Sequence, residues 1–511
     1  MKLLKGNFVK NLTIDLLETA DVFPDKVAVT TESGDLTYKA LRLEVVVAAA
    51  HLREAGITAG TGVGLALKHP IDALVAVLAI GLIGARWMTF PGRDRKEALV
   101  AMGVTHVVAS SKEDAKPTEG LDPRFKLHTW SRHRDPELVK LHAADIRGRA
   151  PLESTWYMAV TSGTTGTPKM MNLSYANYWA RNKKGKLTHD FDPVITCNLF
   201  PPLSGPWLSY NLRTLALQGT LVMSRNFAFL RQKNVQKLFG SPSQYASYLK
   251  SIPADVEGKL PIAHVAGATL SKVFAQQILE RFEIIHNFYG GTEVGGIARN
   301  VIRSAEDNLR CVGRVLEGNE VEVVDTTGNV QMPKTVGLIR VRNNIMVQQY
   351  ANNPTATQEC FKNGWFYSGD TGYFDESGLL YVTGRANDVL NIGGTKVDPH
   401  IIDDALTACE SVAEALTFKG SFEGKDKLAA LIVPVKGSSS QQLRADIASA
   451  MSGLPRHQRV AGVLYVNDLP RNANGKPVRA LAQKLAAGHK FLSVAFSEPA
   501  PADQEHGQTV H

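Results

Sequence analysis

Short apolar runs rich in β-branched residues alternate with helical patterns along most of this chain, and this alternation limits the folds that it can adopt. The strand-like run VAVTTES at 27–33 is followed by a helical pattern at 40–55 and by the run VGLALK at 63–68. Such alternation favours layered α/β structure with largely parallel strands. Between 313 and 350 the pattern changes, because EVEVVD, a Thr-Thr-Gly-Asn turn and VGLIRVR follow one another. These runs predict antiparallel strands, which we interpret as a small distorted β-barrel.

A chain of 511 residues is too long for a single compact core. We therefore predict a large N-terminal domain over 1–386, made of layered α/β subdomains plus the small barrel. A small α+β domain is predicted over 387–492, with one helix near 400–408 and a strand at 428–435. The last residues, 493–511, are polar and rich in proline from Ser497 on, so we expect a disordered tail.

The composition excludes several classes of protein. The 44% hydrophobic and 21% charged content is that of a soluble globular chain. Its four cysteines lie far apart without a CxxC pair, which argues against a zinc site or a disulfide framework and fits a reducing cytosol. The longest apolar run, 73–85, is too short to span a bilayer and is interpreted as a buried helix, and the first residues do not resemble a signal peptide. We expect a soluble cytoplasmic protein without a membrane span.

The net charge of +8 is mild for this length, and no zinc-finger spacing, aromatic-basic strand signature or long basic tail indicates a nucleic-acid partner. Two basic clusters are predicted to be solvated helix faces. The alternative for the second cluster is attraction of a polyanionic ligand such as coenzyme A. The clusters comprise Arg93, Arg95 and Lys96, and Arg181, Lys183, Lys184 and Lys186.

The strongest chemical signal is a run of small hydroxyl residues and glycines that ends in Pro-Lys. Backbone N–H groups of such a run can converge on an anion, and the hydroxyls and the lysine add further donors. It is not a GxxxxGK[ST] loop, because only two residues separate its glycines. A flexible polar loop is the alternative, which the residue order after the apolar Met-Ala-Val disfavours. The run comprises Thr161, Ser162, Gly163, Thr164, Thr165, Gly166, Thr167, Pro168 and Lys169.

This run resembles the phosphate loop of the adenylate-forming superfamily, which includes acyl- and aryl-CoA synthetases, luciferases and peptide-synthetase adenylation domains. Further motifs that resemble those of the superfamily follow in the same order over nearly the whole chain, so the resemblance does not depend on one match. The chain is most similar in type to stand-alone acyl-CoA synthetases. These motifs are Gly267-Ala268-Thr269, Tyr289-Gly290-Gly291-Thr292-Glu293, Ser368-Gly369-Asp370, Gly384-Arg385, Gly394-Thr395-Lys396 and Asn474-Gly475-Lys476.

The resemblance implies that the large domain binds ATP and that the site works by positioning and charge neutralisation, because a carboxylate must attack a phosphate anion. Glu293 suits Mg²⁺, with Thr164 or Thr165 nearby. Asp370 would bind the ribose and Arg385 ribose or phosphate, although an isolated Gly-Asp is usually a turn and Arg385 could form an interdomain salt bridge. The remaining nucleotide-binding residues are Thr161 to Thr167, Lys169, Gly267, Ala268, Thr269, Tyr289 (on adenine, or a core tyrosine), Gly290 and Thr292.

Lys476, in the small domain, resembles the lysine that bridges the substrate carboxylate and the α-phosphate, and it joins Glu293 and Lys169 as a catalytic residue. The superfamily separates its two half-reactions by rotating the small domain, which makes that domain mobile and implies a hinge at Asn387. Relatives commonly have Asp or Lys there, so Asn387 departs from the pattern. Gly394 would then line the channel for the thiol, unless it serves only a tight turn.

The acid itself is constrained by residues 198–211, which lack the aspartate of amino-acid-activating relatives. Ser204 stands where many acyl-CoA synthetases have a histidine, and Trp207 either floors the acid pocket or packs in the core. Gly291 leaves space in the same pocket, so a medium-sized acyl or aryl acid is expected. Coenzyme A is the expected acceptor, with a separate carrier protein or another nucleophile as the alternative. A non-catalytic nucleotide-binding relative is disfavoured because Lys169, Glu293, Asp370 and Lys476 are all present.

Overall fold

The computed structural model divides the chain into two compact units. The first unit comprises Met1–Leu270 and Ala275–Val382, and the second comprises Ser271–Phe274 and Thr383–His511. The domain boundary expected at 386/387 stays a prediction. The residues that the structure describes are 11–90, 96–111, 125–130, 151–161, 169–187, 194–268, 270–422, 424–471, 477–487, 489 and 491–493.

The larger sheet of the first unit has 14 strands within the described residues, and it changes from parallel to antiparallel at β13. Its parallel part runs through β1 (Val27–Thr31), β10 (Thr220–Val222), β9 (Ile195–Asn198), β11 (Lys237–Gly240), β12 (Leu260–Ala266) and β13 (Phe282–Gly291). The sheet continues through β14 (Gly295–Ile302), β15 (Cys311–Val315), β20 (Leu380–Arg385), β19 (Trp365–Phe374), β17 (Gly337–Asn343) and β16 (Asn319–Val324). The last three residues of β20 belong to the second unit. β2 (Gly34–Thr37) pairs with β1, and β18 (Phe361–Lys362) with β19. The expected antiparallel strands between 313 and 350 are thus present.

The second sheet of the first unit has the order β6-β5-β3-β4-β7-β8 among the described residues. Its pairs are parallel except for the last, the hairpin of β7 and β8. Its strands are β6 (Lys126–Thr129), β5 (Val104–Ala109), β3 (Gly62–Ala66), β4 (Arg86–Thr89), β7 (Thr155–Thr161) and β8 (Lys169–Ser174). The helices are α1 (Leu12–Val22), α2 (Tyr38–Glu54), α3 (Pro70–Ile83), α4 (Lys96–Ala101), α6 (Tyr175–Leu187), α7 (Gly205–Ala216), α8 (Phe227–Gln232), α9 (Pro242–Ser251), α10 (Lys272–Arg281) and α11 (Pro354–Cys360).

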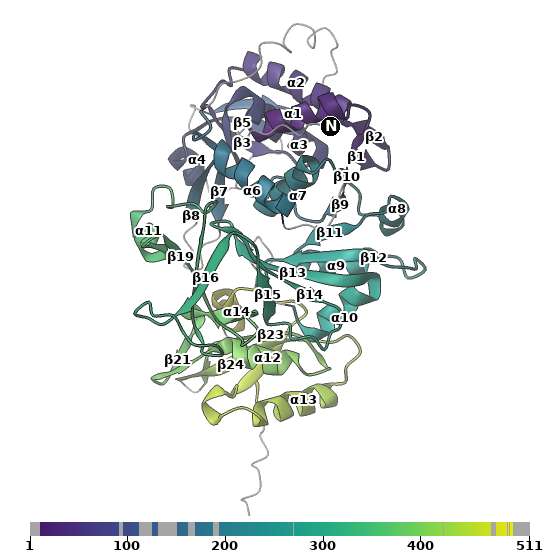
Figure 1. Cartoon of the computed structure of the whole chain (residues 1–511). Helices are drawn as coiled ribbons and strands as arrows, with labels where there is room; N and C mark the ends of the chain where they lie inside the picture. Colours follow the sequence, from purple (N-terminus) through teal and green to yellow (C-terminus); the bar gives the residue numbers. More distant parts are fainter. Residues whose placement is uncertain are drawn as a thin grey trace, which may run out of the picture. The chain divides into compact units, whose positions relative to one another are not determined.

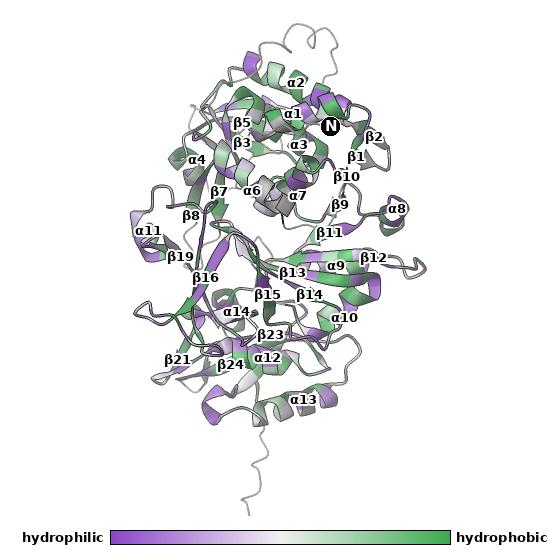
Figure 2. Cartoon of the chain, viewed as in Figure 1, coloured by the Kyte–Doolittle hydropathy of each residue, from purple (hydrophilic) through white to green (hydrophobic). Residues whose placement is uncertain are grey.

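The central helix of this unit is α3, which the apolar run at 73–85 produces. Pro70 suits its first turn, and Gly84 ends it with φ +85°, a conformation that glycine adopts without strain. Every residue from Ala73 to Ile83 is buried, and the helix is almost wholly hydrophobic (Figure 2). α1, α2 and α3 pack together (Figure 1), so α3 is enclosed by other elements and has no solvated face.

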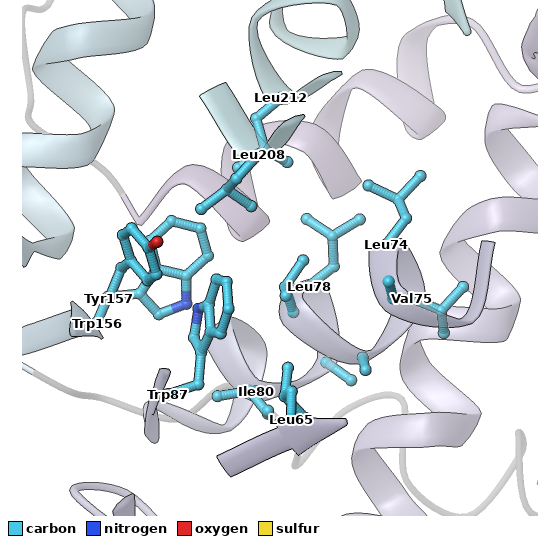
Figure 3. Packing of buried hydrophobic residues seen from close by; sticks show 14 of the residues in the cluster. Leu65, Leu74, Val75, Leu78, Ile80, Trp87, Trp156, Tyr157, Leu208 and Leu212 are labelled. Atoms are coloured by element: carbon cyan, nitrogen blue, oxygen red, sulfur yellow. The ribbon is translucent and has the colours of Figure 1, made fainter. Parts of the chain in front are cut away.

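Aromatic residues of the second sheet pack beside α3 (Figure 3). Trp87 on β4 lies 4.6 Å from Tyr157 and 6.2 Å from Trp156, both on β7, between ring centroids. Leu74 and Leu78 of α3 and Leu208 of α7 belong to the same buried cluster. The core therefore fixes β7, the strand that enters the predicted phosphate loop.

The second unit is built on a four-stranded sheet and a two-stranded hairpin within its described residues. Met451, Val412 and Leu406 are among the side chains of its own buried cluster, so this unit has a core of its own. Its elements are η3 (Ala386–Asp388), β21 (Leu390–Ile392), β22 (Thr395–Val397), α12 (Pro399–Thr407), β23 (Val412–Phe422), β24 (Lys425–Pro434), α13 (Ser440–Ser452), η4 (Arg456–Gln458), β25 (Gly462–Tyr465), α14 (Arg479–Ala486) and β26 (Leu492–Ser493). The expected fold class, layered α/β structure followed by an α+β unit, is confirmed.

Candidate adenylation site

The predicted phosphate loop joins the two strands of a hairpin. Thr161 at the end of β7 pairs with Lys169 at the start of β8, so the two ends of the loop are neighbours. The position of Lys169 is therefore fixed by the sheet, and the lysine stands at the base of the loop. The intervening Ser162, Gly163, Thr164, Thr165, Gly166 and Thr167 lie outside the described residues, and the roles assigned to them stay predictions.

Lys169 is held by residues that are distant in sequence. Its Nζ lies 3.4 Å from Cys360 Sγ and 4.9 Å from the centroid of the Tyr350 ring. The residues that follow Lys169 and Tyr350 are also bonded to each other, because Ala351 N donates to Met170 O at 2.7 Å. A lysine over the face of a tyrosine at this distance is attracted by the ring quadrupole. The ammonium group is thus oriented by the segment at 350–360.

Glu293, the predicted metal ligand, is bound by the same tyrosine. The hydroxyl of Tyr350 donates to Glu293 Oε1 at 2.9 Å. Burial, followed by the charge of Glu293, raises the pKa of Tyr350, so this hydroxyl keeps its proton at neutral pH. Lys169 and Glu293 come from motifs more than a hundred residues apart, and the structure brings both to one side chain.

The backbone around Glu293 is held by Arg181 of α6. The guanidinium donates to the carbonyl oxygens of Thr292 at 2.8 Å, Glu293 at 3.1 Å and Ile345 at 3.0 Å. Burial lowers the pKa of Arg181 to about 10, although Tyr178 and Glu293 act in the opposite direction, and it remains charged at neutral pH. The prediction of a solvated helix face was wrong for Arg181, because its partners are carbonyls of another segment. Lys183, Lys184 and Lys186 have side chains outside those described.

The predicted adenine and ribose residues are direct neighbours. Tyr289 on β13 donates its hydroxyl to Asp370 Oδ2 on β19 at 2.6 Å, and it lies 3.3 Å from Ser368 Oγ. Ser368 Oγ also accepts the backbone N–H of Asp370 at 3.2 Å. Gly369 has φ +79°, which allows the turn between them. These bonds orient the Asp370 carboxylate that is predicted to accept the ribose hydroxyls.

The glycines of the motifs differ in what surrounds them. A Cβ on Gly290 would lie 2.4 Å from the carbonyl oxygen of Gly295, so only glycine fits there. Among the described residues, a Cβ on Gly291 would come close to Glu293 Oε2 alone, at 3.2 Å. Gly267, which precedes Ala268, has φ +104°, and the described residues beyond its chain neighbours leave the position of a Cβ open. Thr269 lies outside the described residues.

The residues predicted to line the acid pocket have structural partners. Ser204 caps α7, because its Oγ accepts the N–H of Trp207 at 3.4 Å and donates to Pro201 O at 2.8 Å. Trp207 is only 2% exposed and belongs to the main buried cluster, which favours its alternative interpretation as a core residue. On the next turn of α7, Tyr210 stacks on Phe239, with ring centroids 4.2 Å apart. The sequence patterns predicted no role for Tyr210, because nothing in its own segment indicates its partner on β11.

The predicted residues of the second unit are partly described. Arg385 ends β20, and the backbone of Asn387 lies in η3. Gly394 is in the turn between β21 and β22 with φ +89°, and its N–H donates to Asn391 Oδ1 at 3.0 Å. Apart from its chain neighbours, no atom of the described residues lies within 4 Å of the position that a Cβ would take, so the turn surface is open with respect to them. Lys476 falls within 472–476, outside the described residues.

A charged network that the sequence patterns did not predict lies next to the predicted hinge. Arg479, the first residue of α14, donates to Asp403 Oδ2 at 2.7 Å and lies 3.1 Å from His400 Nδ1. His400 Nε2 lies 3.3 Å from Asp388 Oδ2, next to the predicted hinge. The network thus joins the residue after Asn387 to the helix that starts just after the lysine motif. Its members are too far apart in sequence to be recognised together.

Among the described residues, no group of three or more His, Cys, Asp and Glu side chains could hold a metal ion. A metal would therefore need oxygens of a substrate in addition to Glu293, as magnesium in phosphate complexes does. No helix in the described parts of the chain is long and apolar enough to cross a membrane.

The sequence model of the family described as AMP-binding enzyme matches residues 16–351. The chain is 26% identical over 485 residues to a 2-succinylbenzoate–CoA ligase from Bacillus cereus, covering 92% of this chain and 98% of that protein. An anthranilate CoA ligase solved in complex with anthranoyl-AMP has a TM-score of 0.83 at 18% identity and covers 96% and 100% of the two chains. An amide bond synthetase from Marinactinospora thermotolerans has a TM-score of 0.79 at 23% identity, over 93% and 99%. The motif-based resemblance to adenylate-forming enzymes is thereby confirmed.

Proposed function

Because the chain belongs to the family of AMP-binding enzymes, we propose that it activates a medium-sized acyl or aryl acid with ATP and passes the acyl group to coenzyme A. The observation that carries this proposal is the meeting of Lys169 and Glu293 at Tyr350. A cation for phosphate and a carboxylate for magnesium are the groups that phosphoryl chemistry needs side by side. The neighbouring pair of Tyr289 and Asp370 supports a nucleoside at the same site.

The residues of the first unit fit MgATP. Glu293 offers carboxylate oxygens, with Thr164 proposed as a further ligand, and magnesium, when bound, neutralises charge on the phosphates. Lys169 adds positive charge at the base of the phosphate loop, and Asp370 accepts hydrogen bonds from the ribose diol. In the second unit, Arg385 is proposed to bind ribose or phosphate.

In the proposed reaction the substrate carboxylate attacks the α-phosphorus of ATP, forming an acyl-adenylate and releasing pyrophosphate. Lys476 is proposed to bridge the carboxylate and the α-phosphate as negative charge develops between them. The thiol of coenzyme A then attacks the acyl carbon, and AMP leaves. Rotation about Asn387 would exchange the lysine motif for the loop of Gly394 between the two steps. The open turn surface at Gly394 supports passage of a slender thiol arm there.

An aromatic acid is the substrate class that we favour. The relatives named for 2-succinylbenzoate and anthranilate act on aromatic acids by those names. In this chain Gly291 leaves room beside Glu293, and the Ser204 segment carries no carboxylate for an amino group. A carrier protein or a nitrogen nucleophile in place of coenzyme A is the alternative for the acceptor.

The test is pyrophosphate release from MgATP across a panel of aromatic, medium-chain and small aliphatic acids, each with and without coenzyme A. We expect release with aromatic acids, faster turnover with coenzyme A, and matching loss of free thiol. Glu293→Gln and Lys476→Ala serve as inactive controls for the first step. Release that coenzyme A does not change would reject the thiol ligase in favour of another acceptor. No release with any acid would contradict acid activation itself.

A further inference from the structure

Tyr350 occupies a fixed position in the first unit. The side chain is 4% exposed, and its ring meets the Phe361 ring edge-on at 5.3 Å. Its backbone N–H donates to Thr357 Oγ1 of α11 at 3.0 Å, and the next residue is bonded to β8 through Met170. The tyrosine is thus anchored from β18, α11 and β8, and its free rotamers are few.

The hydroxyl and the ring of Tyr350 contact two different residues of the candidate site. The hydroxyl donates to one carboxylate oxygen of Glu293, and the ring face lies under the ammonium group of Lys169. The hydroxyl of Tyr350 is bonded to Oε1 of Glu293. The other oxygen, Oε2, faces Gly291 and would lie 3.2 Å from a Cβ placed on that glycine. A carboxylate held through one oxygen presents the other in a defined direction, as partners of metal ligands commonly achieve.

We propose that Tyr350 is a positioning residue that directs the Glu293 carboxylate towards the magnesium of MgATP and holds the Lys169 ammonium beside the phosphates. The proposal rests on the proposed function for the identity of the nucleotide site. Tyr350 itself touches neither substrate nor metal in this scheme. Its effect is to remove conformational freedom from two long side chains before the nucleotide binds, which lowers the entropic cost of binding.

A purely structural tyrosine would produce the same burial, so the test must separate packing from orientation. Tyr350→Phe keeps the ring, its packing and the contact with Lys169, and removes only the hydroxyl. Tyr350→Leu removes both the hydroxyl and the aromatic face. Tyr38→Phe is the matched control. Tyr38 is also buried, at 2% exposed, and it donates its hydroxyl to a backbone oxygen, Gly219 O at 2.8 Å, and not to Glu293.

The readout is the magnesium dependence of ATP binding by the full chain, measured by calorimetry, together with the melting temperature of each variant. We expect Tyr350→Phe to need about tenfold more magnesium for half-maximal binding, the usual cost of losing a partner of a metal ligand. Tyr350→Leu should lose a further threefold or so in ATP affinity at saturating magnesium, since the cation–π contact is gone. Tyr38→Phe should match the wild-type magnesium dependence.

Where an acid from the panel is turned over, Tyr350→Phe should lower the rate of pyrophosphate release and leave the KM for the acid unchanged. Wild-type magnesium dependence in a folded Tyr350→Phe variant would overturn the proposal, as would an equal shift in Tyr38→Phe. If the wild type binds MgATP but releases no pyrophosphate with any acid, acid activation fails while the role of Tyr350 is still decided by binding. Absence of MgATP binding by the wild type would overturn both.

Discussion

Replacing Arg181 by methionine should weaken both the fold and the metal site. The guanidinium donates hydrogen bonds to the carbonyl oxygens of Thr292, Glu293 and Ile345, and the variant loses all of these bonds. A hydrogen bond to a charged group contributes about 1.5–3 kcal/mol net, and an acceptor left unsatisfied costs about 1–3 kcal/mol. Methionine, however, avoids the cost of burying a charge, which offsets part of this loss.

Second donors limit the damage at two of the three carbonyls. Ile345 O keeps Asn177 Nδ2 at 2.8 Å, and Glu293 O keeps Val347 N at 2.8 Å. The main loss therefore falls on Thr292, and we expect a total destabilisation of about 2–4 kcal/mol. For a unit of this size that corresponds to a fall of about 3–6 °C in melting temperature. Asn177→Ala leaves both Arg181 donors to Ile345 O in place, so it should cost less than about 1.5 kcal/mol.

The assay is calorimetric melting of Arg181→Met, Asn177→Ala and Arg53→Met, the last being an exposed arginine of α2, each with and without MgATP. The stabilisation by MgATP should shrink in Arg181→Met, because the Glu293 backbone loses its anchor, and it should be unchanged in Arg53→Met. A melting temperature of Arg181→Met within about 1 °C of wild type, with full stabilisation by MgATP, would refute this reasoning.

Three further changes have defined outcomes. Tyr289→Phe should weaken AMP binding about fivefold to tenfold in calorimetry, since the Asp370 carboxylate loses its 2.6 Å hydrogen bond; unchanged affinity would contradict this. Gly290→Ala should destabilise the fold by about 1–3 kcal/mol in denaturant titration, because its Cβ would lie 2.4 Å from the Gly295 carbonyl, and a wild-type midpoint would contradict the clash. Burial lowers the pKa of His106, so below about pH 6.5 the unfolded chain binds more protons than the folded chain, and the folded state loses stability as the pH falls. The melting temperature of His106→Gln should therefore depend less on pH between about pH 8 and pH 5.

Sequence patterns predicted the elements that local residues determine. The apolar run at 73–85 became α3 because its residues are apolar on every side, and the helical pattern at 40–55 became α2, Tyr38–Glu54. The phosphate loop could be located by its glycines and hydroxyl residues, whereas the pairing of the strands on either side of it was not predicted and is a finding of the structure. These predictions needed no knowledge of distant partners.

The residues that hold the site together could not be predicted in this way. Tyr350 lies 57 positions from Glu293, and Arg181 lies 111 positions from Thr292, so neither segment carries a sign of its partner. Arg181 stands in a run of basic residues, which is typical of a solvated helix face, and only the packing of α6 shows otherwise. The sequence around Trp207 was compatible with a place in the acid pocket or in the core. The burial of its side chain in the structure favours the core.

The central claim is that the chain forms an acyl-adenylate, and oxygen transfer tests it most directly. An aromatic acid with both carboxylate oxygens labelled with ¹⁸O is turned over with MgATP and coenzyme A, and the AMP is analysed by mass spectrometry. Attack of the carboxylate on the α-phosphorus predicts one ¹⁸O atom in each AMP and one in each acyl-CoA. Label in inorganic phosphate with ADP as the nucleotide product, or AMP without label, would contradict the account.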